Sequence, residues 1–250
     1  MNVIVCIKRV PDTEARIRID GSGSSIESSG IKYDMSPYDA FAVEAAIRLK
    51  ESLQGEGDVS VMTLGDSSSG ETLRKALAMG ADRAVLLNGE VSLDGLATAK
   101  TLVAELEDSE ADLFLFGIKA ADDDQQQVGQ MVAVLSGRPC VSGVSSFEID
   151  GQTARCKREV EGGSEIVEVD LPAVLCITKG PNEPRLPALK GIMAAKKKPL
   201  EERPAQLSGS RVRLIGFSTP PARAEGRIVG EGPDAVPELV RILREDAHAI

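Results

Sequence analysis

Short apolar strands alternate with helical patterns over residues 1–135. Strands that are apolar along their whole length are typical of a parallel sheet that helices cover on both faces. The alternation therefore predicts a Rossmann-like layered α/β domain with a parallel sheet. The strand candidates are Val3–Ile7, Val59–Leu64, Ala84–Leu87 and Asp112–Gly117.

Helices are predicted between and after these strands. The first follows Ser36-Pro37, where serine is a good N-cap and proline suits the first helical position. A capping box, Ser68-x-x-Glu71, is predicted to open the second helix, and Gly80 to end it. The predicted helices run from Pro37 to about Lys50, from Glu71 to Met79, from Asp94 to Leu106 and from Gln125 to Leu135.

The pattern changes after residue 143. Four further strands are predicted, with hairpin turns at Asp150-Gly151 and Gly162-Gly163. From Leu200 onward the chain is rich in proline and polar residues, apart from a predicted helix over about Pro237–Glu245. We therefore expect a domain over residues 1–200 with added β-hairpins, followed by a C-terminal arm over residues 201–250. The four strands are Val144–Ile149, Ala154–Val160, Glu165–Val169 and Ala173–Ile177.

A polar run, A-D-D-D-Q-Q-Q-V-G, follows the strand that ends at Gly117. The carboxyl end of a strand is where an α/β sheet binds ligands. A capping box, Asp124-x-x-Gln127, would leave backbone N–H groups of residues 126–128 at the positive end of a helix, as a seat for phosphate or a nucleotide. Three carboxylates would repel phosphate unless they turn away, cap the helix, or meet ribose hydroxyls or a partner chain. The alternative is a solvated loop that caps an ordinary helix.

Composition excludes several functions. A net charge of −10 argues against nucleic-acid binding, which usually requires a basic surface. The four cysteines lack metal-ligand spacing, and a single histidine, His248, makes a zinc site and a histidine-based catalytic set improbable. The N-terminus lacks the features of a signal peptide, and no apolar run could span a bilayer. These features indicate a cytoplasmic protein with reduced thiols.

Several segments, taken in order, resemble the beta subunit of electron transfer flavoprotein, and the resemblance covers nearly the whole chain. They include I-K-R-V-P-D (Ile7–Asp12), S-P-Y-D-A-F-A-V-E-A-A (Ser36–Ala46), E-T-L-R-K-A-L-A-M-G-A-D-R-A (Glu71–Ala84), A-D-D-D-Q-Q-Q-V-G-Q-M (Ala121–Met131), K-R-E-V-E-G-G-S-E (Lys157–Glu165), N-E-P-R (Asn182–Arg185), G-I-M-A-A-K-K-K (Gly191–Lys198) and P-P-A-R-A-E-G (Pro220–Gly226).

The resemblance implies a domain like the adenine nucleotide alpha hydrolases and a carrier component that is not an enzyme by itself. Such subunits form a heterodimer with an alpha subunit that holds most of the redox FAD. The beta subunit binds a structural AMP, and its C-terminal segment reaches the alpha subunit. The complex takes electrons from acyl-CoA and other dehydrogenases and passes them to a membrane quinone oxidoreductase, a role in fatty acid oxidation.

The AMP contacts of the family carry over to strand ends and helix starts in this chain. Cys6 and Leu64 lie at strand ends, where core packing is the alternative for each. The remaining candidates are Ser36, Pro37, Tyr38, Asp39, Gly117, Ile118, Lys119, Ala120, Ala121, Asp122, Asp123, Asp124, Gln125, Gln126, Gln127 and Val128.

Leu189 occupies the position where related sequences carry a leucine at the tip of a loop that docks in the dehydrogenase. The alternative is that Leu189 packs on its own domain. The proline of this loop precedes the leucine by two residues, whereas in some relatives it follows it. Loop shape and the choice of dehydrogenase stay open. Thr13 stands where many relatives carry a tyrosine near the flavin, so no such contact is assigned.

Three other functions compete with this interpretation. Bifurcating relatives hold a second FAD in place of AMP and oxidise NADH, but their loop is typically D-G-D-T-A-Q-V-G-P. Here Asp123 replaces the glycine and Gln130 the proline, which favours AMP. A stand-alone nucleotide sensor would need neither the arm nor the docking loop. A nucleotide hydrolase would be expected to carry a lysine-bearing phosphate loop, which is missing here.

Overall fold

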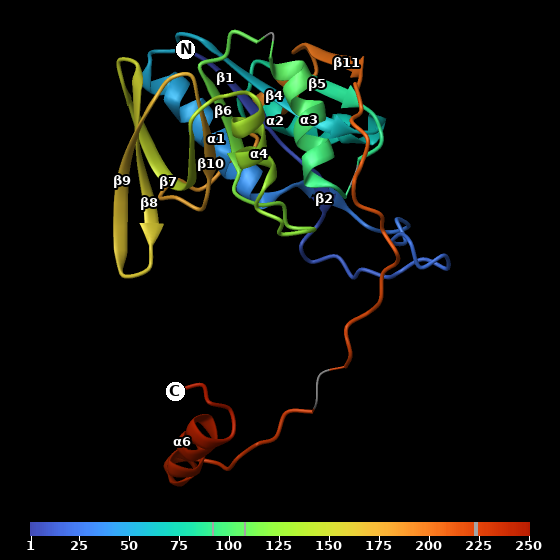
Figure 1. Cartoon of the computed structure of the whole chain (residues 1–250), viewed down its shortest axis with the longest axis vertical. Helices are drawn as coiled ribbons and strands as arrows, with labels where there is room; N and C mark the ends of the chain where they lie inside the picture. The colour runs from blue at the N-terminus through green and yellow to red at the C-terminus, as the bar shows by residue number, and fades with distance from the viewer. Residues whose placement is uncertain (92, 108, 223–224) are drawn as a thin grey trace.

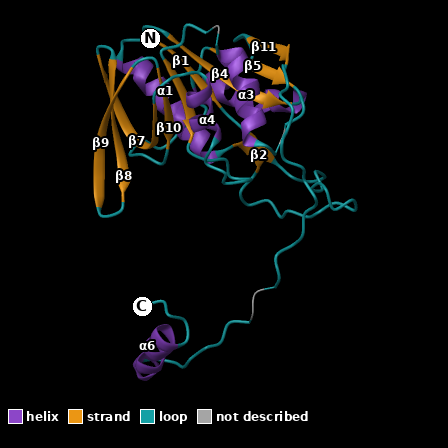
Figure 2. Ribbon diagram, viewed as in Figure 1, coloured by secondary structure: helices purple, strands orange, loops and turns teal. Residues whose placement is uncertain are grey.

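The computed structural model describes residues 1–91, 93–107, 109–222 and 225–250. Arg223 and Ala224, inside the tail motif Pro220–Gly226, lie outside the described residues. The chain forms one large sheet with helices on both faces and a separate helix at its C-terminus (Figures 1 and 2).

The sheet has nine strands in the order β11-β5-β4-β1-β6-β10-β7-β8-β9. The strands from β11 to β7 run parallel, whereas β7, β8 and β9 are joined by antiparallel pairing. The mixed α/β fold with its mostly parallel sheet confirms the predicted class. The strands are β1 (Asn2–Cys6), β4 (Asp58–Gly65), β5 (Arg83–Asn88), β6 (Leu113–Gly117), β7 (Cys140–Asp150), β8 (Thr153–Val160), β9 (Gly163–Asp170), β10 (Ala173–Ile177) and β11 (Leu200–Pro204).

Alternate residues of the central strands enter two different cores, one on each face of the sheet. Val3 and Val5 of β1 pack with α1 (Pro37–Ser52) and α2 (Gly70–Met79). Ile4 and Cys6 pack on the other face with α3 (Gly95–Leu106) and α4 (Val128–Leu135). This two-sided burial is the physical reason why these strands are apolar throughout.

Three strands and one α-helix were not predicted. β2 (Arg9–Pro11) and β3 (Tyr33–Met35) form a small antiparallel pair, and a short helix, α5 (Leu189–Ala195), packs on α2. β11 extends the sheet beside β5 and runs across the expected domain boundary at residue 200. Its sequence, L-E-E-R-P, is largely exposed, so it lacks the apolar pattern by which the inner strands were found.

Both predicted capping boxes are wrong. Helix α2 begins at Gly70 after a 3-10 turn, η1 (Ser67–Ser69), in which Asp66 accepts a hydrogen bond from the Ser68 N–H. Helix α4 begins at Val128 rather than Gln125, because Asp124 and Gln126 have φ values of 51° and 53°. A left-handed residue cannot continue a right-handed helix, so the backbone turns before the helix starts.

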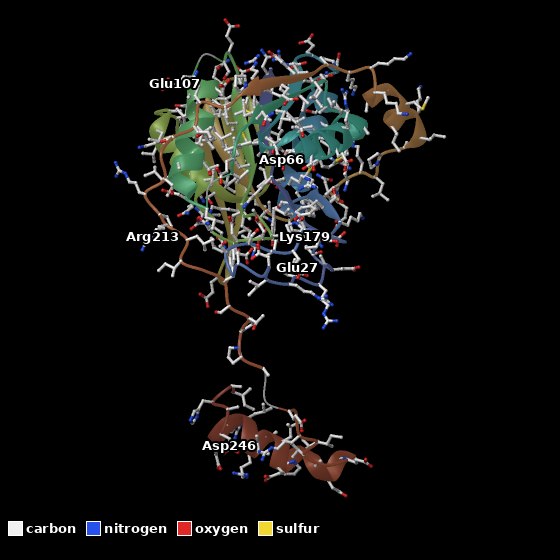
Figure 3. All side chains as sticks on the ribbon, turned by 90° about the vertical axis from the view of Figure 1, so that its right-hand side faces the viewer. Glu27, Asp66, Glu107, Lys179, Arg213 and Asp246 are labelled. Atoms are coloured by element: carbon white, nitrogen blue, oxygen red, sulfur yellow. The ribbon has the colours of Figure 1, made fainter. Side chains whose placement is uncertain are left out.

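The chain after β11 follows the edge of the domain and then leaves it. The Ser208 N–H donates to Thr101 Oγ1 (3.1 Å), and the Arg211 N–H donates to Asp94 Oδ2 (2.7 Å). Farther along, η2 (Pro233–Ala235) leads into α6 (Val236–Glu245), which has no buried residue. Figures 1 and 3 show α6, with Asp246 at its end, standing apart from the domain in both views. Across the described residues, every helix falls short of the length and apolarity that a membrane crossing requires.

Candidate functional site

A pocket opens at the carboxyl ends of β1, β4 and β6. The chain runs from β1 to β4 and β5 on one side of the sheet, and β6 then lies on the other side of β1. This reversal of strand order creates the crevice in which α/β sheets bind nucleotides. Its apolar wall includes Met62, Leu64, Leu102 and Phe116, and its polar rim is made by residues 117–120 and 125–127.

Most of the predicted site residues line this pocket. Ser36, Pro37, Tyr38, Ala121, Asp122 and Asp124 do not line it and lie behind or beside it. The predicted residues in the lining are Cys6, Asp39, Leu64, Gly117, Ile118, Lys119, Ala120, Asp123, Gln125, Gln126, Gln127 and Val128.

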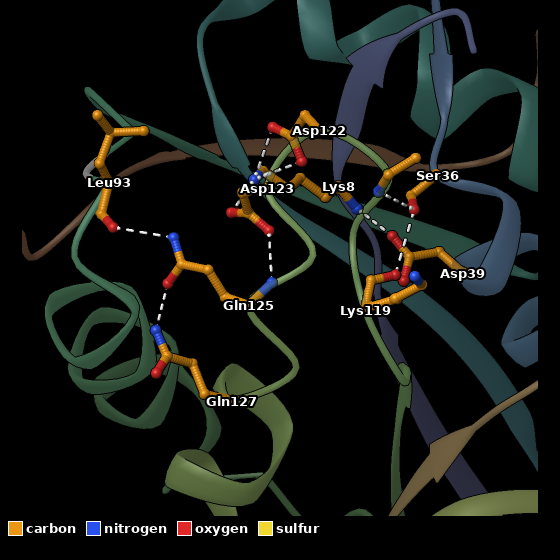
Figure 4. A network of polar contacts seen from close by, with 10 residues as sticks. Lys8, Ser36, Asp39, Leu93, Lys119, Asp122, Asp123, Gln125 and Gln127 are labelled. Carbon is orange, nitrogen blue, oxygen red and sulfur yellow. Dashed lines mark hydrogen bonds and ion pairs between the residues drawn. The ribbon is translucent and has the colours of Figure 1, made fainter. Parts of the chain in front are cut away.

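Ser36 is an N-cap of an unexpected kind. It precedes α1, but its hydroxyl makes no capping hydrogen bond to the helix. Instead the Ser36 Oγ accepts from the Ala121 N–H at 3.3 Å and donates to the Lys119 carbonyl at 3.5 Å. Ser36 is fully buried, so it holds the loop after β6 against the start of α1 (Figure 4).

Asp39 joins the ends of two neighbouring strands. Its carboxylate accepts hydrogen bonds from the Lys8 N–H (2.7 Å) and from the Gly117 N–H (3.0 Å). Burial raises the pKa of Asp39 to about 7, although both backbone N–H groups and the charge of Lys8 act in the opposite direction. The pKa of the Cys6 thiol is raised by burial and by the nearby Asp39, so Cys6 stays protonated and acts as an apolar wall.

The three aspartates of the loop are paired with lysines. Lys8 Nζ contacts Asp122 at 2.8 Å and Asp123 at 2.9 Å, and Lys119 Nζ contacts Asp124 at 2.7 Å. Burial lowers the pKa of Lys8, but its hydrogen bonds to the two aspartates outweigh this and raise the pKa overall. The carboxylates are thus turned to lysine partners, as Figure 4 shows for Asp122 and Asp123, and this removes much of the repulsion expected toward a phosphate group.

The glutamines after the aspartates bind one another and the opposite wall. Gln125 donates from Nε2 to the Leu93 carbonyl (3.2 Å), and Gln127 donates to the Gln125 side chain. Gln126 holds a left-handed conformation that costs a residue of this type about 1–3 kcal/mol. Helix α4 begins at Val128, so of the three backbone N–H groups predicted to bind phosphate at a helix start, those of residues 126–128, only that of Val128 belongs to the helix.

Gly129 lines the pocket and is also required by packing. A side chain there would collide with Cys176 Sγ at 2.6 Å and with Phe116. The close approach of α4 to β6 and β10 therefore requires a residue without a side chain here.

Sequence reasoning missed part of the pocket. Lys8 lies two residues beyond the predicted Cys6. Val91 and Leu93 lie between β5 and α3, and Gly95 and Thr98 lie at the start of α3. Strand-end reasoning could have found these residues, because β1 and β5 are parallel to β4 and end at the same edge of the sheet. No group of three or more potential metal ligands is present in the described part of the chain.

Comparison with known proteins decides the family. The family model of the electron transfer flavoprotein domain matches residues 24–208. The chain is 40% identical over 235 residues to the electron transfer flavoprotein subunit beta of Syntrophomonas wolfei, covering 94% of this chain and 92% of that protein. It is 38% identical to the subunit of the same name from Bradyrhizobium diazoefficiens over 100% of both chains, and 36% identical to that of Mus musculus over 98% of both.

The chain belongs to the electron transfer flavoprotein beta subunit family. The family resemblance found in the sequence is thereby confirmed. Membership implies a part in electron transfer, association with a flavin, and an alpha subunit of electron transfer flavoprotein as partner.

Proposed function

We propose that this chain is the beta subunit of a heterodimeric carrier that takes electrons from acyl-CoA and related dehydrogenases and delivers them to a membrane quinone oxidoreductase. In this proposal the alpha subunit holds most of the redox FAD, and the beta subunit is no enzyme by itself and binds AMP for a structural purpose. The observation that carries the AMP assignment is the pocket at the strand reversal, whose three loop aspartates are paired with Lys8 and Lys119.

The residues present fit an adenine nucleotide. Leu64, Leu102 and Phe116 offer an apolar wall for the base. The loop of residues 117–127 offers backbone and amide donors at the opposite rim, which can bind phosphate without net positive charge. AMP bound there would supply no redox chemistry, so these residues only bind and orient it.

A beta subunit of a bifurcating carrier, with a second FAD that oxidises NADH, is the competing function. A glycine at position 123 would leave room for a longer cofactor to pass the backbone. Asp123 instead lines the pocket, and its carboxylate is bound by Lys8 at 2.9 Å. The pair of Lys8 and Asp123 narrows the path that the pyrophosphate of an FAD in this pocket would take. This supports AMP as the ligand.

Nucleotide analysis of the heterodimer tests the proposal. The chain is co-purified with its alpha subunit, the nucleotides are released by denaturation, and they are quantified by chromatography. We expect one AMP and one FAD per heterodimer. Two FAD and no AMP would establish the bifurcating function instead.

The proposal also places the protein in the cytoplasm, where a thiol-reducing environment suits four cysteines that are all free.

Docking to the dehydrogenase is proposed for Leu189. Its side chain is 78% exposed as the first residue of α5, rather than at the tip of an irregular loop. Leu186, Ile192 and Met193 are exposed beside it in the sequence, and such an apolar patch is typical of a protein-binding surface. These four residues are called the docking patch below.

We expect Leu189→Ala to leave folding unchanged, because the side chain is exposed, and to slow electron uptake from the dehydrogenase. A truncated anchor residue at a protein interface costs about 1–2 kcal/mol, or about tenfold in affinity. Steady-state transfer kinetics with the heterodimer measure the effect, and thermal unfolding serves as the control. Unchanged kinetics would refute docking through Leu189.

A further inference from the structure

The segment that carries the docking patch lacks regular structure before α5. Residues 178–188 leave the end of β10 and reach α5 without forming a helix or strand. A free loop of this kind would lose conformational entropy each time its apolar residues bound a partner. The contacts of Arg185, at its centre, show how this loop is held.

Arg185 binds two glutamates of α1. Its Nε donates to Glu44 Oε2 at 2.8 Å, and its Nη1 donates to Glu51 Oε1 at 2.6 Å. Its Nη2 reaches both carboxylates, at 3.1 Å and 3.0 Å, and its backbone N–H donates to Glu44 Oε2 at 3.1 Å. The planar guanidinium is suited to such paired contacts, which a lysine could not reproduce.

Glu44 gives this contact a rigid base. Its side chain is 1% exposed, and Arg48 Nε, one helical turn along α1, donates to its Oε1 at 2.6 Å. Burial raises the pKa of Glu44, but hydrogen bonds from Arg185 and Arg48 outweigh it and lower the pKa overall, so Glu44 is ionised at neutral pH. A buried, ionised partner fixes Arg185 far better than a solvated one.

The other end of the docking patch is held by α2. Arg74 Nη1 donates to the Ala195 carbonyl at 2.7 Å and to the Lys198 carbonyl at 2.8 Å. Lys198 Nζ donates to the carbonyls of Leu77 (3.1 Å) and Ala81 (2.6 Å). A side chain at Gly191 would collide with the Ala78 carbonyl, so α5 lies directly against α2. Both ends of the patch are thus fixed, while its apolar side chains face solvent.

We propose that Arg185 is a positioning residue for dehydrogenase docking: its contacts with Glu44 and Glu51 hold the docking patch in its binding conformation before the partner arrives. The inference rests on the proposed docking function. Arg185 would touch neither the flavin nor the dehydrogenase, and its effect would be on affinity for the dehydrogenase rather than on the rate within the bound complex.

Arg185→Gln in the heterodimer tests the proposal, with Glu51→Gln as a second variant. Glu51 is 56% exposed, so its substitution removes one of the two partners of Arg185 without burying a charge. Glu44 keeps its contacts with Arg185 and Arg48. We expect the dehydrogenase's KM for the carrier to rise about three- to tenfold with Arg185→Gln, less with Glu51→Gln, and kcat to stay within about twofold. Arg155→Gln, which breaks an exposed ion pair with Glu168 between β8 and β9, at the opposite edge of the sheet from β11, is the matched control and should leave KM unchanged.

Two further measurements separate positioning from a general loss of structure. Amide hydrogen exchange of residues 182–193 should quicken about tenfold with Arg185→Gln, while exchange in the central strands stays the same. In a double-mutant cycle, Arg185→Gln should raise KM little further once Leu189→Ala is present, because both changes act on one contact.

Unchanged exchange in residues 182–193 would overturn the proposal. So would a KM increase that is fully retained when Leu189→Ala is present, because Arg185 would then act on a different contact. A third outcome is that Arg185→Gln and Leu189→Ala each leave KM unchanged while exchange quickens with Arg185→Gln. The segment would then be fixed by Arg185 without being the docking site, which overturns both this inference and docking through Leu189. The nucleotide content of the heterodimer would be unaffected by that outcome.

Discussion

Gly117→Ala is expected to lower the free energy of unfolding of the heterodimer by about 3 kcal/mol and to remove most of the AMP that we propose for the pocket. A Cβ atom at this position would collide with Asp39 Oδ1 and approach the Asp39 N and the Tyr38 carbonyl carbon at 2.7 Å. These atoms belong to the first turn of α1, which is fixed on the sheet, so the strand end or the helix would have to move. Either movement displaces the loop of residues 117–127 that forms the rim of the pocket.

Urea unfolding and nucleotide release by denaturation measure the two effects. Gly70→Ala is the matched control, because the first residue of α2 has a helical φ of −58° and an added Cβ there meets nothing within 4 Å. We expect this control to be neutral or to stabilise the protein by less than about 1 kcal/mol. Full AMP content and unchanged stability in Gly117→Ala would show that the contact between β6 and α1 does not support the nucleotide pocket.

The sequence predicted the sheet well because its inner strands are buried on both faces. Apolar residues satisfy that condition best, so β1, β4 and β6 are visible as largely apolar runs, and β10 was predicted with its observed bounds, Ala173–Ile177. Edge strands are under no such constraint. β11 has one buried neighbour and exposed glutamates, and it was therefore interpreted as part of the arm.

The site was predicted by position but not by its contacts. Strand-end reasoning pointed to the loop after Gly117, whereas Cys6 and Leu64 were taken from the family resemblance. All three line one pocket, since parallel strands end at the same edge of a sheet. The role of Lys8 could not be foreseen, because it depends on bringing residues 8 and 122–123 together across the sheet. The capping boxes failed because other local turns precede both helices: Asp66 accepts from Ser68 in the turn before α2, and Asp124 and Gln126 have left-handed φ values before α4.

The buried network around Arg185 was missed as well. In the sequence, Glu44 is one charged residue within a predicted helix. Neither it nor its neighbours in the chain indicate that its side chain is buried. Only the return of the chain, 141 residues later, supplies the arginine that makes burial of this carboxylate favourable. Long-range charge pairs of this kind have no periodicity, so sequence patterns do not predict them.

Asp39→Asn is expected to remove a pH dependence from the stability of the protein. Burial raises the pKa of Asp39 from 3.8 to about 7 in the folded state, while the unfolded chain keeps the ordinary value. Between these two pH values the folded state binds a proton that the unfolded state has released, so stability falls as pH rises. The total loss is on the order of 4 kcal/mol, since one pKa unit corresponds to about 1.4 kcal/mol. Above pH 7 this contribution no longer changes.

An asparagine has nearly the same shape but cannot titrate. Its one side-chain oxygen cannot accept from the Lys8 and Gly117 N–H groups as well as a carboxylate does. At pH 8 we therefore expect Asp39→Asn to be about 1–3 kcal/mol less stable than the wild type. Unfolding midpoints of both proteins, measured from pH 4 to pH 8, test the sign: the wild type should lose stability over this range relative to Asp39→Asn. Asp66→Asn is the control. The hydrogen bond from Ser68 lowers the pKa of Asp66, so the pH dependence of stability that this substitution removes should lie below pH 4. Parallel curves for wild type and Asp39→Asn would mean that Asp39 is ionised throughout, held as a carboxylate by the two N–H groups that join β1 to β6.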